Sequence, residues 1–329
     1  MTNSEILFLS SNEITSILTM QDCIDAMRSA FINFSQGKSI VPQRISLNLS
    51  KDNDEALFMP AFENESDFAS LKIVSVFKNN PQINLPKIQA LIILIDAKTG
   101  STLSIMDGEY ITAMRTGAVS GLATDLLAKR DSQTAAIIGT SVQAVTQLEA
   151  IDCVRELRKV FIFGLTLKDA EKFVDQNKNK YSFELIPAEN KSLLNECDII
   201  CTATSSLTPV FEDINIKEGS HINSIGSYKP NMCEIPEGTI LRSKLVADSI
   251  SACLNEAGDI IQPINKGSIT QDHIYAELGE IASGVKSGRK NEEEITVFKS
   301  VGIAIQDLAV SSYVYKKAMK MKLGKKISI

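Results

Sequence analysis

The sequence of 329 residues has no tryptophan and only two histidines, and its six cysteines are scattered. None of the cysteines forms a CxxC pair, which is the commonest spacing of zinc ligands, so we predict no metal site. Scattered cysteines usually act as small buried apolar residues. Cys197 and Cys201, which flank an apolar segment, are expected to do so.

Two further features are missing, an excess of positive charge and a long apolar run. The net charge is −6, which is unfavourable for contact with a phosphate backbone, so no nucleic-acid partner is predicted. No uncharged apolar stretch reaches the roughly 18 residues that a membrane span needs. Residues 1–9 carry no basic segment ahead of an apolar run, so we expect a cytoplasmic protein without a secretory signal.

The chain does contain two successive patterns of hydrophobicity, and its length suggests two domains. Residues 44–107 form short alternating segments between polar turns, which predicts an antiparallel sheet. After residue 131, continuous apolar segments alternate with helical ones, which predicts a parallel sheet covered on both faces. The expected fold class is α/β: a Rossmann-type doubly wound parallel sheet plus a second α+β domain with a largely antiparallel sheet.

The individual elements follow from the spacing of the apolar side chains. Strands are predicted at residues 6–9, 44–49, 71–77, 88–95, 135–138, 160–163, 183–186, 198–204, 221–225 and 245–247. Helices are predicted from Ser11 and over residues 20–34, 108–129, 142–151, 170–174 and 298–323. In the last helix, Ile303, Ala304, Leu308 and Val310 are expected to face inward.

A glycine turn follows the strand at residues 135–138. Gly139 would make the tight turn of a dinucleotide-binding motif, and Ala144 is small enough to let the next helix pack on the strand. Ser141 stands where a second glycine would let the backbone approach the pyrophosphate. From these residues alone, a cofactor turn and an ordinary strand-to-helix turn remain equally open, and the strand–helix–strand context favours the cofactor.

The end of the second strand of such a domain usually selects between the two nicotinamide cofactors. An acidic residue there binds the ribose hydroxyls of NAD, whereas a basic residue pairs with the 2′-phosphate of NADP. This chain has Gly164-Leu165-Thr166, which supplies neither group. Lys168 lies nearby as a possible phosphate contact or as an ordinary solvated lysine. The sequence therefore predicts NAD(P)H without a preference between NADH and NADPH.

Several motifs occur in an order that resembles one known family. They are Leu85-Pro86-Lys87-Ile88-Gln89-Ala90, Asp96-Ala97-Lys98-Thr99-Gly100, Thr112-Ala113-Met114-Arg115-Thr116-Gly117-Ala118, the Gly139 turn with Gln143-Ala144, Asp198-Ile199-Ile200 leading to Thr204, Glu256-Ala257-Gly258-Asp259, Glu277-Leu278-Gly279-Glu280 and Phe298-Lys299-Ser300-Val301-Gly302. Together they span about residues 44–307. In this combination the chain is similar to the ornithine cyclodeaminase/mu-crystallin family.

The resemblance implies that basic residues of the non-Rossmann domain bind the carboxylate of an amino or imino acid. The matching positions are Arg44, Lys72 and Arg115, with Lys72 and Arg115 also as the catalytic candidates. Each lies in or beside an apolar segment, where a charge is costly unless it is paired. The residues themselves leave an anionic ligand and an internal salt bridge equally open, and the resemblance favours the ligand.

The resemblance also assigns residues of the Rossmann domain. Val301 and Tyr228 are implied at the substrate, and Ser300 with Val301 would close the nicotinamide side. The cofactor-binding residues implied are Gly139, Ser141, Val142, Gln143, Thr204, Ile225 and Ser300.

Tyr228 is where this chain departs from the ornithine-cyclising members, which carry an aspartate two residues before the proline of that loop. A phenol with an ordinary pKa of about 10 is a poor general base at neutral pH. The departure makes ring-closing deamination doubtful. It favours reduction of a cyclic ketimine, either Δ1-pyrroline-2-carboxylate to L-proline or Δ1-piperideine-2-carboxylate to L-pipecolate.

Two other functions stay open. One is an ornithine cyclodeaminase or open-chain amino-acid dehydrogenase, and the other is a non-catalytic mu-crystallin-like binder.

By resemblance, the substrate-binding domain covers residues 1–118, joined by the C-terminal helix at about 305–329, and the dinucleotide domain covers 119–304. Family members dimerise through the first domain, and we expect a homodimer paired through a face of its sheet rich in arginine and lysine.

Overall fold

The computed structural model describes residues 5–50, 54–64 and 66–328. The chain forms two compact units: unit 1 comprises Met1–Arg115 and Ile303–Ile329, and unit 2 comprises Thr116–Gly302. The boundaries predicted from the sequence, after residues 118 and 304, lie within three residues of this division. Residues 1–4, 51–53, 65 and 329 of the predicted first domain lie outside the described residues.

The sheet of unit 1 has the strand order β16-β1-β7-β6-β5-β4-β2, with β3 also paired to β4. Its strands are β1 (Glu5–Leu9), β2 (Ser39–Ile40), β3 (Ile45–Asn48), β4 (Glu55–Glu63), β5 (Phe68–Val76), β6 (Ile88–Asp96), β7 (Thr102–Asp107) and β16 (Lys325–Ser328). The pairings are antiparallel except that of β1 with β7. The helices of this part of the chain are α1 (Ser11–Ile17), α2 (Met20–Ser35), α3 (Gly108–Leu127) and α10 (Ala304–Met321).

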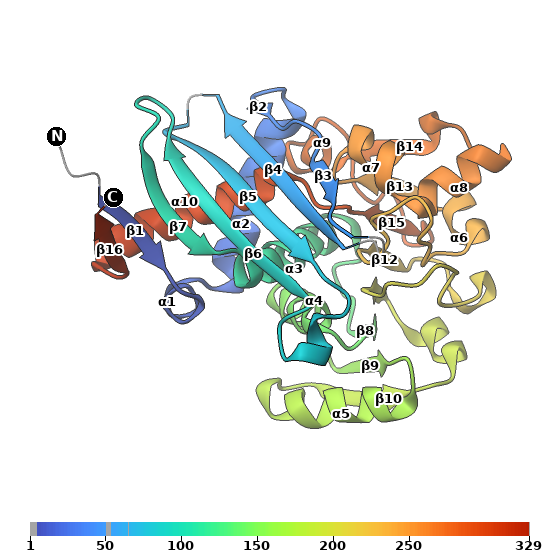
Figure 1. The fold of residues 1–329 in the computed structure, drawn as a ribbon. Coiled ribbons are helices and arrows are strands. Elements are labelled where there is room, and N and C mark those ends of the chain that lie inside the picture. Colours follow the sequence, from blue (N-terminus) through green and yellow to red (C-terminus); the bar gives the residue numbers. More distant parts are fainter. Residues whose placement is uncertain (1–4, 51–53, 65, 329) are drawn as a thin grey trace. The chain divides into compact units, whose positions relative to one another are not determined.

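One face of this sheet packs on α10, which lies along β4, β5 and β6 and also contacts α2 (Figure 1). Side chains alternate across a strand, so the even-numbered residues of β5 point to this covered face, and those from Phe68 to Val74 are buried. Lys72 is one of them, and its strand neighbours in register are Met59 and Ile92. The helix that covers this face, α10, begins at Ala304. Asp307 lies in its first turn and so on the same side of the sheet as Lys72.

The other face of the sheet carries apolar side chains that remain exposed. Leu91 is 46% exposed, Ile45 59% and Leu47 48%. The strict alternation of residues 44–49 predicts one buried side, but all of β3 is exposed because the strand lies at the margin of the sheet. The expected arginine- and lysine-rich face is also wrong for these strands, since the outward residues of β5 and β6 include Leu71, Ile73 and Leu91.

Unit 2 is a parallel sheet with the strand order β10-β9-β8-β11-β12-β15-β13-β14. Its strands are β8 (Thr134–Ile138), β9 (Lys159–Phe163), β10 (Glu184–Ala188), β11 (Ile199–Thr202), β12 (His221–Ser224), β13 (Lys244–Ala247), β14 (Ile274–Glu277) and β15 (Thr296–Lys299). Its further helices are α4 (Val142–Val154), α5 (Leu167–Asn177), α6 (Glu237–Leu241), α7 (Ile250–Glu256), α8 (Gly258–Lys266) and α9 (Leu278–Ala282). The predicted doubly wound parallel sheet is confirmed.

Two apolar cores cover the two faces of this sheet, because successive residues of its strands point to opposite sides. One core joins Ile137 and Ile162 to α4 and α5, and the other joins Ile138 and Phe163 to α6, α7 and α8. Cys197 and Cys201 lie in these cores as predicted. Cys153 does not, since it is exposed near the end of α4.

The helix predicted from residue 298 is wrong at its start. Residues 296–299 form β15, and α10 begins only at Ala304. Gly302 has a φ of +77°, a left-handed conformation that interrupts a helix. Ile303 therefore precedes the helix as its N-cap residue, although it is buried as expected.

Candidate functional site

The turn after β8 requires a glycine. Gly139 has a φ of +125°, and a Cβ at this position would lie 2.6 Å from the carbonyl oxygen of Ala203. Its N–H donates to the carbonyl oxygen of Phe163, at the end of β9, over 2.8 Å. Gly139 thus occupies the carboxyl edge of the sheet among β8, β9 and β11, where ligands of open α/β folds bind.

The start of α4 next to this turn has the properties of an anion-binding helix end. Ser141 is its N-cap residue, yet its side chain caps no N–H group of the first turn. The backbone of Ser141 is in an ordinary extended conformation, so the serine causes no backbone strain in place of glycine. Gln143 has a buried side-chain oxygen without a hydrogen-bond partner. The first N–H groups of a helix have no partner within it, and together with this unsatisfied amide they fit a dinucleotide.

The other predicted cofactor residues follow β11, β12 and β15, and therefore lie at the same edge of the parallel sheet. Thr204 and Ile225 come just after their strands, and Gly226 approaches Thr204 so closely that a Cβ would meet its carbonyl oxygen at 2.0 Å. The hydroxyl of Ser300 donates to Asp248 over 2.7 Å. The side chain of Ser300 is thus used within the protein.

A buried carboxylate, Glu234, holds two of these loops together. It accepts hydrogen bonds from the backbone N–H groups of Thr204 and Gly226, both at 2.7 Å, and of Ser227 at 3.1 Å. Burial raises its pKa, while the nearby Lys299 ammonium opposes that rise. Because all three donors belong to loops at the carboxyl edge, Glu234 fixes the relative position of those loops.

Asp248 and Asp259 complete this buried scaffold. Asp248 accepts from the N–H groups of Val301 at 3.0 Å and Gly302 at 2.8 Å, and so fixes the segment after β15. Asp259 pairs with Lys299 at 2.9 Å, and both side chains are almost fully buried. Charges without solvent are stable only when paired and hydrogen-bonded, which these are.

In unit 1, two of the predicted cations meet a carboxylate that sequence reasoning did not assign to the site. The Lys72 ammonium lies 2.7 Å from Oδ2 of Asp307, and Nε of Arg115 lies 3.2 Å from Oδ1. Arg115 also donates to the side-chain oxygen of Gln306. Lys72 and Asp307 are almost fully buried. The internal salt bridge that the sequence left open is therefore present.

Opposing effects act on the pKa of Lys72 in this cluster. Burial lowers its pKa to about 7, Asp307 opposes that decrease, and the neighbouring cations Arg115 and Arg44 add to it. The structure thus brings Lys72, Arg115 and Arg44 into one electrostatic neighbourhood. An added anion would favour the protonated lysine by the same physics.

Unlike Lys72 and Arg115, which belong to unit 1, Tyr228 belongs to unit 2. Its ring packs partly buried against the core under α6, α7 and α8. Its ring centroid is 5.7 Å from the Lys229 ammonium. The packing shows a structural role and leaves its predicted contact with substrate untested.

The residues that sequence reasoning missed are Asp307, Gln306, Glu234, Asp248 and Asp259. Each is an acidic or amide side chain within an apolar segment or next to one, a pattern it shares with Lys72, which the family resemblance had identified. Their partners lie far away in the sequence, so the pairing itself could not be read from spacing.

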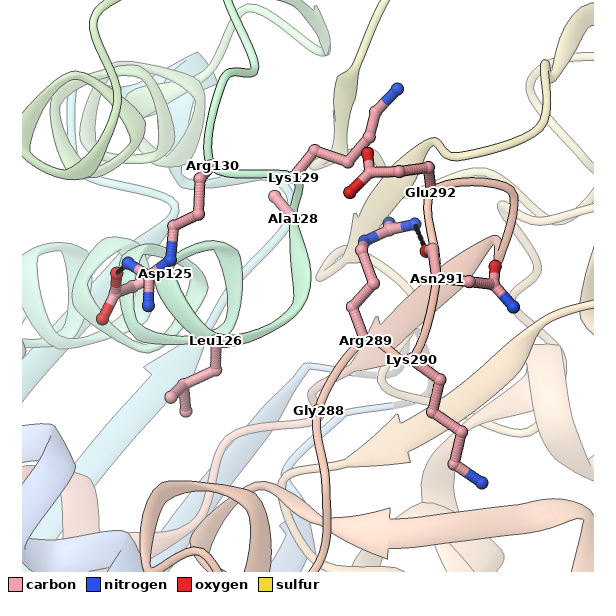
Figure 2. Close-up of a pocket in the computed structure, with 10 residues that line it drawn as sticks. All are labelled: Asp125, Leu126, Ala128, Lys129, Arg130, Gly288, Arg289, Lys290, Asn291 and Glu292. Carbon is pink, nitrogen blue, oxygen red and sulfur yellow. Dashed lines mark hydrogen bonds and ion pairs between the residues drawn. The ribbon is translucent and has the colours of Figure 1, made fainter.

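A hollow of about 320 Å³ lies at the opposite, amino edge of the sheet of unit 2, between residues 125–130 and 288–292 (Figure 2). Arg289 donates to the carbonyl oxygen of Leu127 at 2.8 Å, and Arg130 pairs with Asp125 at 3.0 Å. Arg155 donates to the carbonyl oxygens of Thr124 and Ala128 as well. These arginines cap the end of α3, so we assign the hollow a structural role.

In the described part of the chain, no helix is long and apolar enough to cross a membrane. Within the same residues, no three histidine, cysteine, aspartate or glutamate side chains are grouped so that they could hold a metal ion.

The chain is similar to known proteins along nearly its whole length. The sequence profile of the ornithine cyclodeaminase/mu-crystallin family matches residues 4–322. A Δ1-pyrroline-2-carboxylate reductase of Bacillus cereus is 38% identical over 324 residues, which cover 98% of this chain and 99% of that protein. An alanine dehydrogenase of Archaeoglobus fulgidus is 36% identical and covers 98% of each chain.

A solved structure has nearly the same fold. It is the Δ1-pyrroline-2-carboxylate reductase of Thermococcus litoralis in complex with NADH and L-proline, with a TM-score of 0.94 and 40% identity. The match covers 98% of this chain and 100% of that one.

Proposed function

Because the chain belongs to the ornithine cyclodeaminase/mu-crystallin family, we propose that it reduces a cyclic imino acid with NADH or NADPH. The main reaction is Δ1-pyrroline-2-carboxylate to L-proline, with Δ1-piperideine-2-carboxylate to L-pipecolate as the larger-ring counterpart. The observation that carries the proposal is a dinucleotide turn in unit 2 together with a cation cluster in unit 1, in a chain whose relatives include reductases of this substrate.

The reduced nicotinamide supplies a hydride to the carbon of the C=N bond when it is bound. In this chain, the turn at Gly139 and the exposed start of α4 would bind the pyrophosphate. The rest of the cofactor site would be lined by Gln143, Thr204, Ile225 and the segment at Ser300. Glu234 and Asp248 would act as positioning residues, since they fix the loops that carry these groups.

Arg44, Lys72 and Arg115 would bind the substrate carboxylate in unit 1. The ion pair with Asp307 does not prevent substrate binding. Even beside Asp307 the pKa of Lys72 is lowered, so a second carboxylate would still stabilise its charge. A carboxylate next to Lys72 and Arg115 would oppose the effects that disfavour the lysine charge, and arginine binds carboxylates in a planar, bidentate manner.

Lys72 would also supply the proton that the reaction needs. A neutral imine that accepts a hydride at carbon must gain one proton at nitrogen, whereas a protonated imine needs none. A lysine whose pKa is about 7 gives up its proton near neutral pH far more readily than an ordinary lysine does.

A second candidate is an open-chain amino-acid dehydrogenase, which the archaeal alanine dehydrogenase among the relatives supports. Ring-closing deamination is less well supported, because Tyr228 occupies the position of the aspartate that handles the amine. A phenol with an ordinary pKa near 10 is a weak base at neutral pH.

We further propose that the protein forms a homodimer through the exposed apolar face of unit 1. Leu91, Ile45 and Leu47 are each about half exposed there, and contiguous apolar surfaces usually mark protein contacts. A cytoplasmic location stays a proposal as well.

The test of this function is steady-state oxidation of NADH and of NADPH with three substrates in parallel: Δ1-pyrroline-2-carboxylate, Δ1-piperideine-2-carboxylate, and pyruvate with ammonia. L-Ornithine with NAD⁺ is tested separately by ammonia release, because ring-closing deamination consumes no net cofactor. We expect turnover with a cyclic ketimine. Turnover confined to pyruvate with ammonia would establish the second candidate, and thermal stabilisation by the dinucleotide without turnover on any substrate would indicate a binder.

A further inference from the structure

The end of β9 has no group that would select NADH over NADPH. Phe163 is followed by Gly164 and by Leu165, which is 97% exposed. The hydroxyl and N–H of Thr166 both donate to the carboxylate of Asp169, at 2.7 and 3.0 Å, so this acid is already used as the capping group of α5. An acidic residue at the strand end would bind the ribose hydroxyls and repel a 2′-phosphate, and here none is present.

A lysine from the neighbouring strand reaches this place instead. Lys191 follows β10 by three residues, and the last residue of β10, Ala188, is in register with Phe163 at the end of β9. The Lys191 ammonium lies over the Phe163 ring, 4.0 Å from its centroid. Phe163 is also the residue whose carbonyl oxygen accepts from the Gly139 turn. Lys191 is therefore at the carboxyl edge, next to the turn that would bind the cofactor.

This ammonium has no counter-ion among the described residues. It is half-buried, and no carboxylate of those residues forms an ion pair with it. Burial lowers its pKa to about 8, and the more distant Glu189 only partly opposes that decrease. A half-buried cation beside an aromatic ring is stabilised by the ring, but a charge with no ionic partner remains costly.

We propose that Lys191 binds the 2′-phosphate of NADPH and thereby makes this chain an NADPH-using member of its family. The inference rests on the proposed function, since it concerns the cofactor of that reaction. A phosphate dianion supplies the counter-ion that Lys191 lacks, and the glycine at position 164 leaves the strand end without a repelling charge. The alternative is that Lys191 serves only to cover Phe163.

The experiment compares the wild type with Lys191→Met, which keeps an unbranched side chain over Phe163 but removes the charge. Lys168→Met removes the charge of the exposed lysine at the start of α5, which is the rival phosphate contact. Lys172→Met, one turn further along the same helix and also exposed, is the matched control. The readouts are kcat/KM for NADPH and NADH, and the affinities for 2′,5′-ADP and 5′-AMP measured by calorimetry.

We expect Lys191→Met to lower kcat/KM for NADPH about tenfold or more and to weaken 2′,5′-ADP binding by a similar factor. NADH and 5′-AMP should change less than twofold, and Lys172→Met should change nothing. Equal losses for both cofactors, no loss in Lys191→Met, or a selective loss in Lys168→Met would each overturn the inference. The fragment affinities need no substrate, so a selective loss of 2′,5′-ADP binding would uphold the inference even if the ketimine reaction failed.

Discussion

At the scale of the residue, the most informative group is Lys72, a buried lysine between an aspartate and two arginines. Its pKa is lowered to about 7 from the model-compound value of 10.5. The unfolded chain therefore binds more protons than the folded chain between these two pH values. As a result, this group makes the free energy of unfolding increase as pH rises through that window.

The same pKa predicts a pH dependence of activity. If protonated Lys72 binds the carboxylate and supplies the proton, kcat/KM should fall as pH rises above about 7. The fall in kcat should come at higher pH, because a bound anionic substrate raises the pKa of Lys72. Steady-state profiles from pH 5 to 10, with the substrate's own titration measured separately, check this.

Two variants make the pH prediction specific. Lys72→Arg should lower kcat, because a guanidinium does not give up its proton in this range, and the remaining activity should lack the alkaline fall, because the charge persists. Asp307→Asn should move the fall to lower pH, because Asp307 is the group that raises the pKa of Lys72. An unchanged profile in both variants would show that another group titrates.

Sequence reasoning found the cations of this cluster but missed their carboxylate. The family resemblance identified Lys72, and its apolar neighbours indicated a charge that needs a partner. The identity of the partner depends on tertiary structure, and Asp307 reaches Lys72 only because α10 packs across β5. The buried acids Glu234 and Asp248 escaped notice for the same reason.

At the scale of the element, the β8–α4 turn can be tested through its glycine. Gly139→Ala should lower the free energy of unfolding by at least about 1–3 kcal/mol, the cost of an unfavourable backbone conformation. The new Cβ would also press on the carbonyl oxygen of Ala203, so dinucleotide affinity should fall. Urea unfolding and calorimetric titration with NADH measure the two effects.

The matched control for this turn is Gly267→Ala in the same unit. Gly267 has a similarly left-handed φ of +77°, but no atom lies within 4 Å of the position of its Cβ. Gly267→Ala should lower the free energy of unfolding by only about 1–2 kcal/mol, the cost of the backbone conformation, and leave dinucleotide affinity unchanged. Equal behaviour of the two variants would show that the turn at Gly139 has no special contact with the cofactor.

Most strands and helices could be predicted because their apolar side chains repeat with a clear period. The errors fall where that signal is weak or shared. Residues 296–299 are a short apolar segment that also suits the start of a helix, and only the left-handed Gly302 separates strand from helix. The strands β2, β14 and β16 and the helices α6, α7, α8 and α9 were not predicted, and β4 and β7 were predicted only as part of the sheet at residues 44–107.

At the scale of the whole molecule, the exposed apolar face of unit 1 predicts a homodimer. The chain has a mass of 35.9 kDa, so sedimentation or light scattering should give about twice that value. Leu91→Glu should shift the protein towards monomer, because a symmetric contact would bury two unpaired carboxylates at a cost of several kcal/mol.

Val285→Glu is the control for this surface, since Val285 is 72% exposed in unit 2 and outside the proposed contact. It should leave the assembly unchanged. A wild type that remains monomeric at micromolar concentration, or a Leu91→Glu variant that assembles normally, would contradict the proposed interface.

The two-unit architecture could be predicted from the change of pattern along the chain, because alternating and continuous apolar segments imply different sheets. What covers the exposed face of unit 1 could not be predicted in this way. Alternation in residues 44–49 indicates that one side is apolar, but whether a helix or another subunit covers that side depends on the topology.

The central claim is that unit 1 binds the substrate carboxylate through its cations while unit 2 independently binds the dinucleotide. The measurement that tests it most directly is the pair of values kcat/KM for Δ1-pyrroline-2-carboxylate and Kd for NADH, in the wild type and in Arg115→Met. Loss of a charge-assisted contact worth about 1.5–3 kcal/mol should lower kcat/KM about 10- to 100-fold and leave the Kd for NADH unchanged. An unchanged kcat/KM, or an equal loss in both values, would contradict the account.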